Sequence, residues 1–498
     1  MKYSLLWIFI AWMLVSCNDF LEESSQDEVR PTTVEDLMQV MIGEAYPMET
    51  KFSRFLDHLT DDMECNGISG EETLEVGLEN ARPAFSWSED MFEEMASVDG
   101  VDAWSAYYAK IMGCNVVLGY LDRVSGDIET KENMRGQALV LRGWYYFMLV
   151  NLFGQPYNVG NPEENLGVPL KLKMEVTDEF FARNTVAEVY EQIEKDLLEG
   201  VDLLERYNKS VSLYKVNYLV GKSILSRVYL YMEEWDKSLE YSNEVLAEKS
   251  ELTSLASMSD LGLQSKIGIY SDAVGDEVIW KFGDLTEYDG SPLYATGLSC
   301  SSPYVVSKEL MALYETSDNS LNYLDLRARL YYYYAAYFST TTYMLEYYIR
   351  FGWKGGYNQK YAAGKGIRTA ELYLNRTEVY VRKYMETGDD QYRKDALNDL
   401  NKLRENRYDI RNVEYMKVEI TDPDELFEFY KNERRRELSF EGHRWFDLRR
   451  MGMPRIEHKY FLDATNVQTF VLEEKSPRYV LPIPDNARER NPLLVPNP

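Results

Sequence analysis

The sequence predicts a mostly α-helical fold with a smaller region of loops and short strands. Over most of the chain beyond residue 33, apolar residues recur three and four positions apart, which is the period of one helix face. Strand-forming residues gather mainly in one short cluster, residues 278–282. Hydrophobic residues make up 45% of the chain and charged residues 28%, which excludes disorder throughout.

The N-terminus has the pattern of a lipoprotein signal. Lys2 precedes an apolar run over residues 5–15 that is too short to span a bilayer, and Leu14-Val15-Ser16-Cys17 resembles a bacterial lipobox. We expect residues 1–16 to be removed and Cys17 to be acylated, so that the body is carried on a membrane surface. The acidic residues 17–32 would form a tether. The alternative is an ordinary secretory signal with a chance cysteine.

Length and charge limit the possible functions. Removal of the signal leaves 482 of the 498 residues, more than a single core usually organises, so we expect two substructures or a solenoid with a cap. The net charge of −29 repels polyanions, which makes nucleic acid a poor partner and a neutral ligand the simpler expectation. The charge has a plainer explanation too, because it keeps an exposed protein soluble.

Cysteine and histidine are scarce. Beyond Cys17, the chain contains Cys65, Cys114 and Cys300, which can form at most one disulfide, and we expect buried thiols. With only three histidines, a histidine-rich metal centre is not expected. We predict neither a metal nor another cofactor.

Several helices are predicted in order along the chain. The first begins near Thr33, with Thr32 or Thr33 as its cap. Residues 64–100 lose the helical period and gather glycine and proline, which predicts a long loop. Helices are expected again over residues 101–124 and 131–153. The second of these is apolar on two faces and should therefore be buried by its neighbours.

Two helical hairpins follow, with apolar stripes over residues 220–246 and 370–403. Each resembles a tetratricopeptide unit, and we favour degenerate repeats. The alternative is a pair of unrelated hairpins, because Ser226 and Ser238 stand where the repeat usually has alanine. Between the hairpins, residues 250–362 contain sixteen of the 40 tyrosines, and we expect loops and short strands there. Residues 454–498 should be irregular because prolines forbid long helices.

Catalytic motifs are missing from the sequence. It contains neither a Gly-x-Ser-x-Gly nucleophile elbow nor a His-Glu-x-x-His zinc motif. Gly364-Lys365-Gly366 has part of a phosphate-loop pattern but is not followed by Ser or Thr, and we interpret it as a turn. With 83 Asp and Glu residues, no carboxylate pair for glycoside hydrolysis stands out.

Several segments together carry a family resemblance. They are Arg142-Gly-Trp-Tyr-Tyr-Phe147 with Phe153-Gly154-Gln-Pro156, residues 367–376, Glu433 to Arg449, Tyr479-Val-Leu-Pro482-Ile-Pro484, and Cys17-Asn-Asp-Phe-Leu-Glu22. The sequence resembles the SusD/RagB family of outer-membrane nutrient-binding lipoproteins. Thr377 and Val379 depart from the small residues usual in their helix, and the middle region matches poorly.

The resemblance implies a fold, a location and a partner. The fold would be SusD-like, with a helical repeat scaffold mainly in residues 33–63, 101–250 and 363–453. The ligand region would lie mainly in residues 64–100 and 251–362. The protein would lie on the outer membrane facing outwards, capture a glycan or peptide, and act as the lid of a SusC-like TonB-dependent transporter. Binding would be its whole function, without catalysis.

Residues 433–449 form the most charged segment of the resemblance. Arg434, Glu437, Glu441 and Arg444 are spaced three and four apart, which predicts ion pairs along a helix. We interpret this cluster as a structural ionic network and not as a catalytic site.

A sugar site needs aromatic platforms beside amide and carboxylate groups, because a pyranose has apolar faces and a rim of hydroxyls. Such residues concentrate in the two loop-rich regions. The candidates are Asn66, Asn80, Arg82, Trp87, Tyr288, Asp289, Tyr294 and Trp353. Each aromatic among them could instead be core, and two of Tyr331 to Tyr334 could be exposed on a strand. Asp284 and Asp289 suit a turn better than a calcium site.

Three hypotheses about function remain open at this stage. The first is a glycan-binding lid protein, the second is a peptide-binding uptake protein, and the third is a surface glycosidase. Exposed aromatic residues in a shallow site would favour the first, and exposed backbone edges in a groove would favour the second. Release of product from a glycan would establish the third.

Overall fold

The computed structural model describes most of the chain from residue 30 onward. The described residues are 30–47, 53, 55–66, 72–98, 101–209, 212–260, 268–271, 274–282, 303–316, 324–339, 344–352, 354, 365–411, 414–462 and 466–497. Cys17, the signal and most of the tether lie outside them. Among the described helices, none combines the length and apolar character that a membrane span requires.

The N-terminal half is built from long helices around a central one. Helix α2 (Val34–Val40) begins after Thr33, one of the two predicted cap residues, which forms a capping box with Asp36. It continues into the π-helix η1 (Met41–Ala45). Helix α6 (Ala103–Tyr120) and helix α8 (Val186–Arg206) both pack against α7 (Ile128–Phe153). Helix α7 is buried from residue 136 to 153, which confirms the prediction from its two apolar faces.

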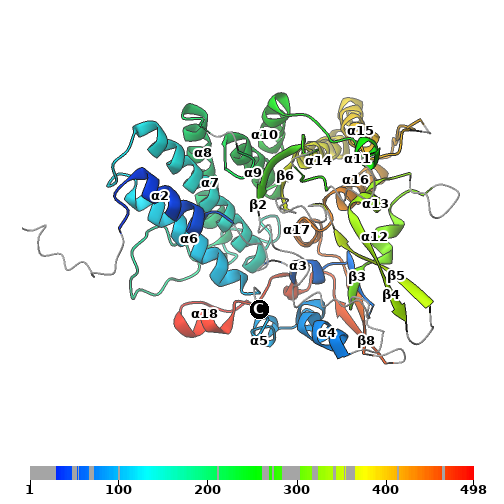
Figure 1. The fold of residues 1–498 in the computed structure, drawn as a ribbon, viewed down its shortest axis with the longest axis horizontal. Helices are drawn as coiled ribbons and strands as arrows, with labels where there is room; N and C mark the ends of the chain where they lie inside the picture. Colours follow the sequence, from blue (N-terminus) through cyan, green and yellow to red (C-terminus); the bar gives the residue numbers. More distant parts are fainter. Residues whose placement is uncertain are drawn as a thin grey trace, which may run out of the picture.

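Both predicted hairpins are present. The first pairs α9 (Tyr218–Tyr231) with α10 (Trp235–Glu248), and the second pairs α14 (Thr369–Thr387) with α15 (Asp390–Glu405). Helix α10 also packs against α14, and α14 against α16 (Pro423–Leu438). The helices therefore follow one another across the molecule, from α8 at the upper left to α15 and α16 at the right of Figure 1. The fold is mostly helical with hairpin repeats, as predicted.

Small buried residues allow the hairpin helices to approach closely. Ser226 and Ser238 are fully buried, and the Ser238 hydroxyl donates to the Ser226 carbonyl oxygen at 2.9 Å. The Ser226 and Ser242 hydroxyls lie 2.8 Å apart. Serine therefore takes the place of alanine without leaving a buried hydroxyl unpaired. In α14, Thr377 is also buried, and its hydroxyl donates to the Tyr373 carbonyl oxygen.

Four two-stranded antiparallel sheets and several short helices complete the described fold. The sheets pair β1 (Met63–Cys65) with β3 (Tyr304–Val306), β2 (Val278–Phe282) with β6 (Lys365–Arg368), β4 (Tyr332–Ser339) with β5 (Met344–Gly352), and β7 (Ile456–Phe461) with β8 (Val467–Leu472). The short helices are α3 (Phe55–His58), α5 (Met91–Glu94), α11 (Leu255–Asp260), α12 (Lys308–Ala312), α13 (Arg327–Leu330), α17 (Arg444–Arg450) and α18 (Asp485–Arg490).

The prediction of one long loop over residues 64–100 was wrong for its central part. Helix α4 (Glu72–Phe85) occupies it and includes both Gly77 and Pro83. Leu78, Ala81 and Phe85 are buried at spacings of three and four, so packing stabilises the helix. Pro83 lies within three residues of the C-terminal end, where it disrupts few of the helix hydrogen bonds.

Two further predictions need correction. Lys365 and Gly366 belong to strand β6 and not to a turn, and Gly366 pairs with Lys281 of β2. The C-terminal segment contains the regular hairpin β7–β8 in addition to irregular chain. The prolines cluster after β8, so they do not interrupt this pairing.

Candidate ligand-binding surface

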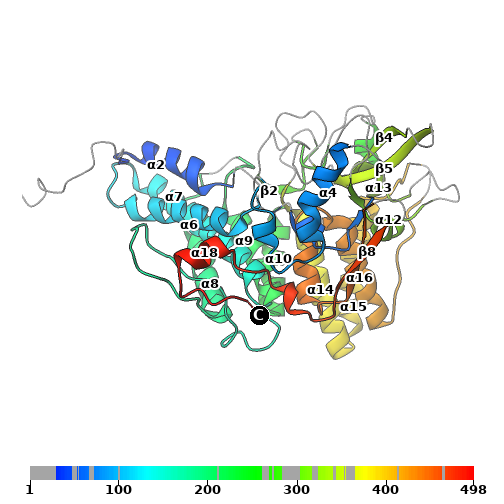
Figure 2. The same cartoon turned by 90° about the horizontal axis from the view of Figure 1, so that it is seen from below.

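The two regions predicted to carry the ligand site lie side by side. Strand β1, from the first region, pairs with β3, from the second, with Cys65 opposite Tyr304. The pairing continues beyond the strands, because the backbone N–H of Asn66 donates to the Pro303 carbonyl oxygen at 2.7 Å. In both views, α4 lies at the same end of the molecule as β4 and β5 (Figure 1, Figure 2).

Helix α4 is tied to this junction from both sides. The Tyr304 hydroxyl of β3 donates to the Leu78 carbonyl oxygen of α4 at 2.8 Å. On another face, the Tyr460 hydroxyl of β7 donates to Glu79 Oε1 at 2.9 Å. The Arg82 guanidinium lies 5.6 Å from the Tyr460 ring centre and 3.8 Å from Glu79. These contacts hold the end of α4 in a defined orientation.

Three predicted site residues lie at this junction and reach its surface. Asn66 and Asn80 are half-buried, and the Arg82 side chain is 41% exposed. Their amide and guanidinium groups are the hydrogen-bonding groups that hydroxyl-rich ligands need. The sequence did not predict Glu79 and Tyr460 as their neighbours. Tyr460 lies in the unpredicted β7–β8 hairpin, and its only sequence signal was the alternation of apolar and polar residues there.

Trp87, the fourth candidate from this region, has a core position in the structure. It is 3% exposed, its ring stacks on His458 at 4.2 Å between ring centres, and its indole N–H donates to the Leu59 carbonyl oxygen at 3.0 Å. Phe85 stacks on the same imidazole at 4.1 Å. The Phe85 and Trp87 rings thus both stack on the His458 imidazole, and the buried Trp87 offers no exposed face for a sugar.

The remaining candidates, Tyr288, Asp289, Tyr294 and Trp353, lie outside the described residues, as do Asp284 and Cys300. The first three fall in the connection between β2 and β3, and Trp353 follows β5. Cys65 and Cys114 are both buried. Within the described ranges, no three His, Cys, Asp or Glu side chains gather where they could hold a metal ion.

Tyrosines at the start of β4 are core residues. Tyr331 and Tyr332 are both buried, which removes the first two of the four consecutive tyrosines from any exposed platform. The Tyr331 hydroxyl donates to Glu437 at 2.9 Å, and the Tyr332 hydroxyl lies 2.7 Å from that of Ser439. Trp104, Trp280 and Trp445 are buried as well.

The charged segment after residue 433 forms the centre of a buried ionic network. Glu437 accepts from Arg407 at 2.9 Å, from Arg368 at 2.8 Å and from Arg327 at 3.1 Å. All four side chains are fully buried. Together the arginines lower the pKa of Glu437 below its usual range, against the effect of burial. The group is therefore a permanently charged structural anchor.

Lys354 and Glu441 extend this network. The Lys354 ammonium donates to the Glu437 and Ser439 carbonyl oxygens at 2.7 and 2.8 Å and to Glu441 at 2.6 Å. Burial lowers the pKa of Lys354 to about 8. Because all three of its N–H groups have partners, the ammonium fixes the chain around residue 440 and is not available to a ligand.

The prediction that these charges pair along one helix was wrong for the residues named. Helix α16 ends at Leu438, and the left-handed conformations of Phe440 and Gly442 turn the chain sharply before α17. Arg434 pairs instead with Asp447 of α17 at 2.8 Å, and Arg444 pairs with Asp61 at 2.7 Å. The expected structural role is nevertheless confirmed, because the ionic network joins segments that are distant in the sequence.

Comparison with known proteins agrees with this architecture. A family model described as "Starch-binding associating with outer membrane" matches residues 19–230, and one described as "SusD family" matches residues 291–498. No curated protein matched the chain in a sequence search.

Solved structures share the fold over almost the whole chain. A SusD superfamily protein from Bacteroides thetaiotaomicron VPI-5482 has 21% sequence identity and a TM-score of 0.69, covering 94% of this chain and 100% of that one. A SusD-like carbohydrate binding protein from Bacteroides vulgatus ATCC 8482 has 20% identity and a TM-score of 0.66, covering 93% and 97%. A SusD-like carbohydrate binding protein from Bacteroides fragilis NCTC 9343 has 17% identity and a TM-score of 0.64, covering 93% and 99%.

The two family models cover most of the chain, including the segments 142–156 and 433–449 that carried the resemblance. The helical hairpins and the folds of the solved structures agree with them. This chain belongs to the SusD/RagB family.

Proposed function

We propose that this protein is a cell-surface lipoprotein that binds an oligosaccharide nutrient and serves as the lid of a SusC-like TonB-dependent transporter. Family membership supports the binding role, and two of the similar structures carry the description of carbohydrate binding proteins. The lipobox at Cys17 and the acidic tether up to residue 32 support surface anchoring. The proposal involves binding without catalysis.

The proposed site is the surface around the β1–β3 junction, and the pairing of these two strands is the observation that carries it. Asn66 follows β1 directly, Asn80 and Arg82 lie on the adjoining α4, and Tyr288, Asp289 and Tyr294 precede β3 in the chain. We assign the aromatic faces to Tyr288, Tyr294 and Trp353, and the hydrogen bonds to sugar hydroxyls to Asn66, Asn80, Arg82 and Asp289.

Calorimetric titration tests the proposal. The mature chain, purified in detergent, is titrated with a panel of neutral plant and host glycans and then with peptides. We expect saturable heat with one class of glycan, reduced about tenfold or more in affinity by Arg82→Ala and by Trp353→Ala. The matched control is Arg206→Ala, which removes an exposed arginine with an intrahelical carboxylate partner from α8, away from this surface.

Other outcomes of this titration would decide between the alternatives. Binding of peptides but of no glycan would replace the proposal with a peptide-uptake function. Release of shorter sugars during the titration would indicate a glycosidase. Glycan binding that survives both site variants would place the site elsewhere.

A further inference from the structure

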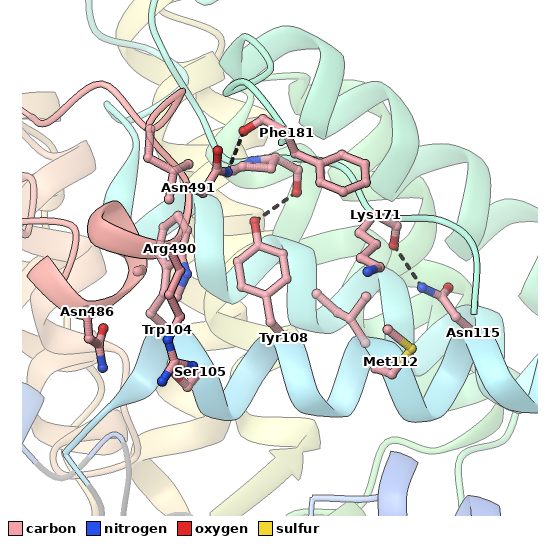
Figure 3. Close-up of a pocket in the computed structure, with 14 residues that line it drawn as sticks. Trp104, Ser105, Tyr108, Met112, Asn115, Lys171, Phe181, Asn486, Arg490 and Asn491 are labelled. Carbon is pink, nitrogen blue, oxygen red and sulfur yellow. Dashed lines mark hydrogen bonds between the residues drawn. The ribbon is translucent and has the colours of Figure 1, made fainter. Parts of the chain in front are cut away.

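A groove along α6 has the size and the lining of a ligand site. It has a volume of about 340 Å³, at the small end of the range for ligand sites. Helix α6, the segment around residues 169–181 and the C-terminal helix α18 form its walls (Figure 3). Tyr108 and Met112 lie on one face of α6 because they are four residues apart, and Phe181 covers the groove from the facing segment.

Side chains hold the walls of the groove in place. The Tyr108 hydroxyl donates to the Pro169 carbonyl oxygen at 2.8 Å, and the Asn115 amide donates to the Lys171 carbonyl oxygen at 2.8 Å. On the other side, the Asn491 amide donates to the Phe181 carbonyl oxygen at 2.8 Å. The groove is therefore preorganised, which lowers the entropic cost of binding. These bonds also occupy backbone carbonyls that an extended peptide would need for strand pairing.

The charge of the groove is opposite to that of the whole protein. Its 14 lining residues include the cations Lys171 and Arg490 but no Asp or Glu, in a chain whose net charge is −29. Within the part of the chain that the structure describes, neither cation forms an ion pair, and Lys171 lies 5.5 Å from the Phe181 ring centre. In Figure 3, Tyr108 projects between the end of the groove that carries Arg490 and the end that carries Lys171.

We propose that this groove is a second saccharide site, which binds a sugar that carries a carboxylate, of the uronic acid type. The rings of Tyr108 and Phe181 suit the apolar face of a sugar ring, and Lys171 and Arg490, at the two ends of the groove, provide charge-assisted hydrogen bonds to carboxylates of different residues in a short acidic oligosaccharide. The exposed Ser105 hydroxyl and Asn486 amide reach the same groove and supply partners for hydroxyls. This second site rests on the proposed saccharide-binding function, and it takes an acidic class of sugar at a separate place on the protein.

Titration of the mature chain with tri-galacturonic acid, and with the matching neutral trisaccharide of galactose, tests this site. We expect the acidic sugar to bind about tenfold or more tightly than the neutral one, and its affinity to fall as salt increases. Lys171→Met and Arg490→Met should each weaken the acidic sugar about tenfold while leaving the melting temperature unchanged. Arg490 is exposed, so its variant tests the site even if Lys171→Met fails to fold.

The control is the double variant Lys394→Met with Arg206→Met, which removes two exposed positive charges from α15 and α8. It should leave binding of the acidic sugar unchanged. Equal affinity for both trisaccharides, no binding of tri-galacturonic acid, or unchanged binding in both groove variants would overturn the inference. Arg82→Ala separates the two sites, because it should weaken only ligands of the β1–β3 surface.

Discussion

Arg407 Nε lies 2.9 Å from Glu437 Oε2, and both side chains are completely buried although thirty residues separate them in the chain. Arg407 follows the end of α15, and Glu437 lies in the last turn of α16. This ion pair therefore holds α15 and α16 together. Arg407 also contacts Glu277, at 3.0 Å, beside strand β2. The network thereby connects helices α15 and α16 to the start of strand β2, from which the chain continues towards the proposed ligand surface.

Loss of the Glu437 charge should destabilise the fold strongly. Glu437→Gln keeps the shape of the side chain but leaves three buried arginines with less negative charge around them, and we expect a loss of about 3–5 kcal/mol in the free energy of unfolding. Denaturant titration followed by circular dichroism measures this. Asp202→Asn, which breaks the exposed pair with Arg206, should cost less than about 1 kcal/mol. Equal costs for the two variants would contradict the central place of the network.

Gly366 should not tolerate a side chain. A Cβ at this position of β6 would overlap the Trp280 carbonyl oxygen of β2, and backbone atoms cannot move aside as a flexible side chain can. We expect Gly366→Ala to cost about 3 kcal/mol of stability. The control is Gly43→Ala, where nothing lies within 4 Å of the added carbon. Thermal melting of both variants checks the expectation, which fails if they melt at the same temperature.

Stability should fall as the pH drops below neutrality. Burial lowers the pKa of His458 to about 4, whereas a histidine in an unfolded chain titrates near 6.5. Between these values the unfolded chain binds a proton that the folded one does not, so the free energy of unfolding decreases as the pH falls from about 6.5 to about 4. Burial and nearby cations lower the pKa of His443 in the same direction.

The contribution of His458 can be isolated. Between pH 7 and pH 4.5 it should account for about 2 kcal/mol of the loss in unfolding free energy. His458→Gln should therefore make the dependence of stability on pH shallower over this range, whatever its effect at neutral pH. Denaturant titrations at several pH values measure the slope. An identical slope in the variant would show that His458 is protonated in the folded state, where two carbonyl oxygens face its ring nitrogens.

Membrane attachment should depend on one residue. Cys17→Ala removes the proposed acylation site and leaves residues 18–498 unchanged. We expect the wild-type protein in the membrane fraction of cells and the variant outside it, because the described helices contain no membrane span that could replace the lipid. Fractionation followed by immunoblotting checks this. Retention of the variant on membranes would mean that something other than a lipid on Cys17 holds the protein there.

The helical scaffold could be predicted because its signals are local. The spacing of apolar residues over 131–153 predicts a buried helix, and the structure has α7 there. Helix α4 was missed because Gly77 and Pro83 suggested a loop, whereas the burial of its apolar residues decided the conformation. In β7, Ile456, His458 and Tyr460 are buried in strict alternation, a signal that was present in the sequence but was hidden by the neighbouring prolines.

The sites could be predicted only in part, because they depend on contacts between distant segments. The partners of Glu437 come from residues 327, 368 and 407, and no spacing in the sequence joins them. In the same way, Lys171 and Arg490 line the same groove although more than three hundred residues lie between them. Trp87 was predicted as a sugar platform because it lies in a loop-rich region with amide and charged residues. In the structure it stacks on His458 and is buried.

A crystal structure of the mature body with the tightest-binding glycan of the panel tests the central claim most directly. We predict sugar density against Asn80 and Arg82 of α4 and beside the end of β1 at Asn66, the place where the two ligand regions meet. Density at that surface in the wild type, and its loss in the Arg82→Ala variant, would establish the binding site. Sugar bound elsewhere on the protein, with this surface empty, would contradict the account.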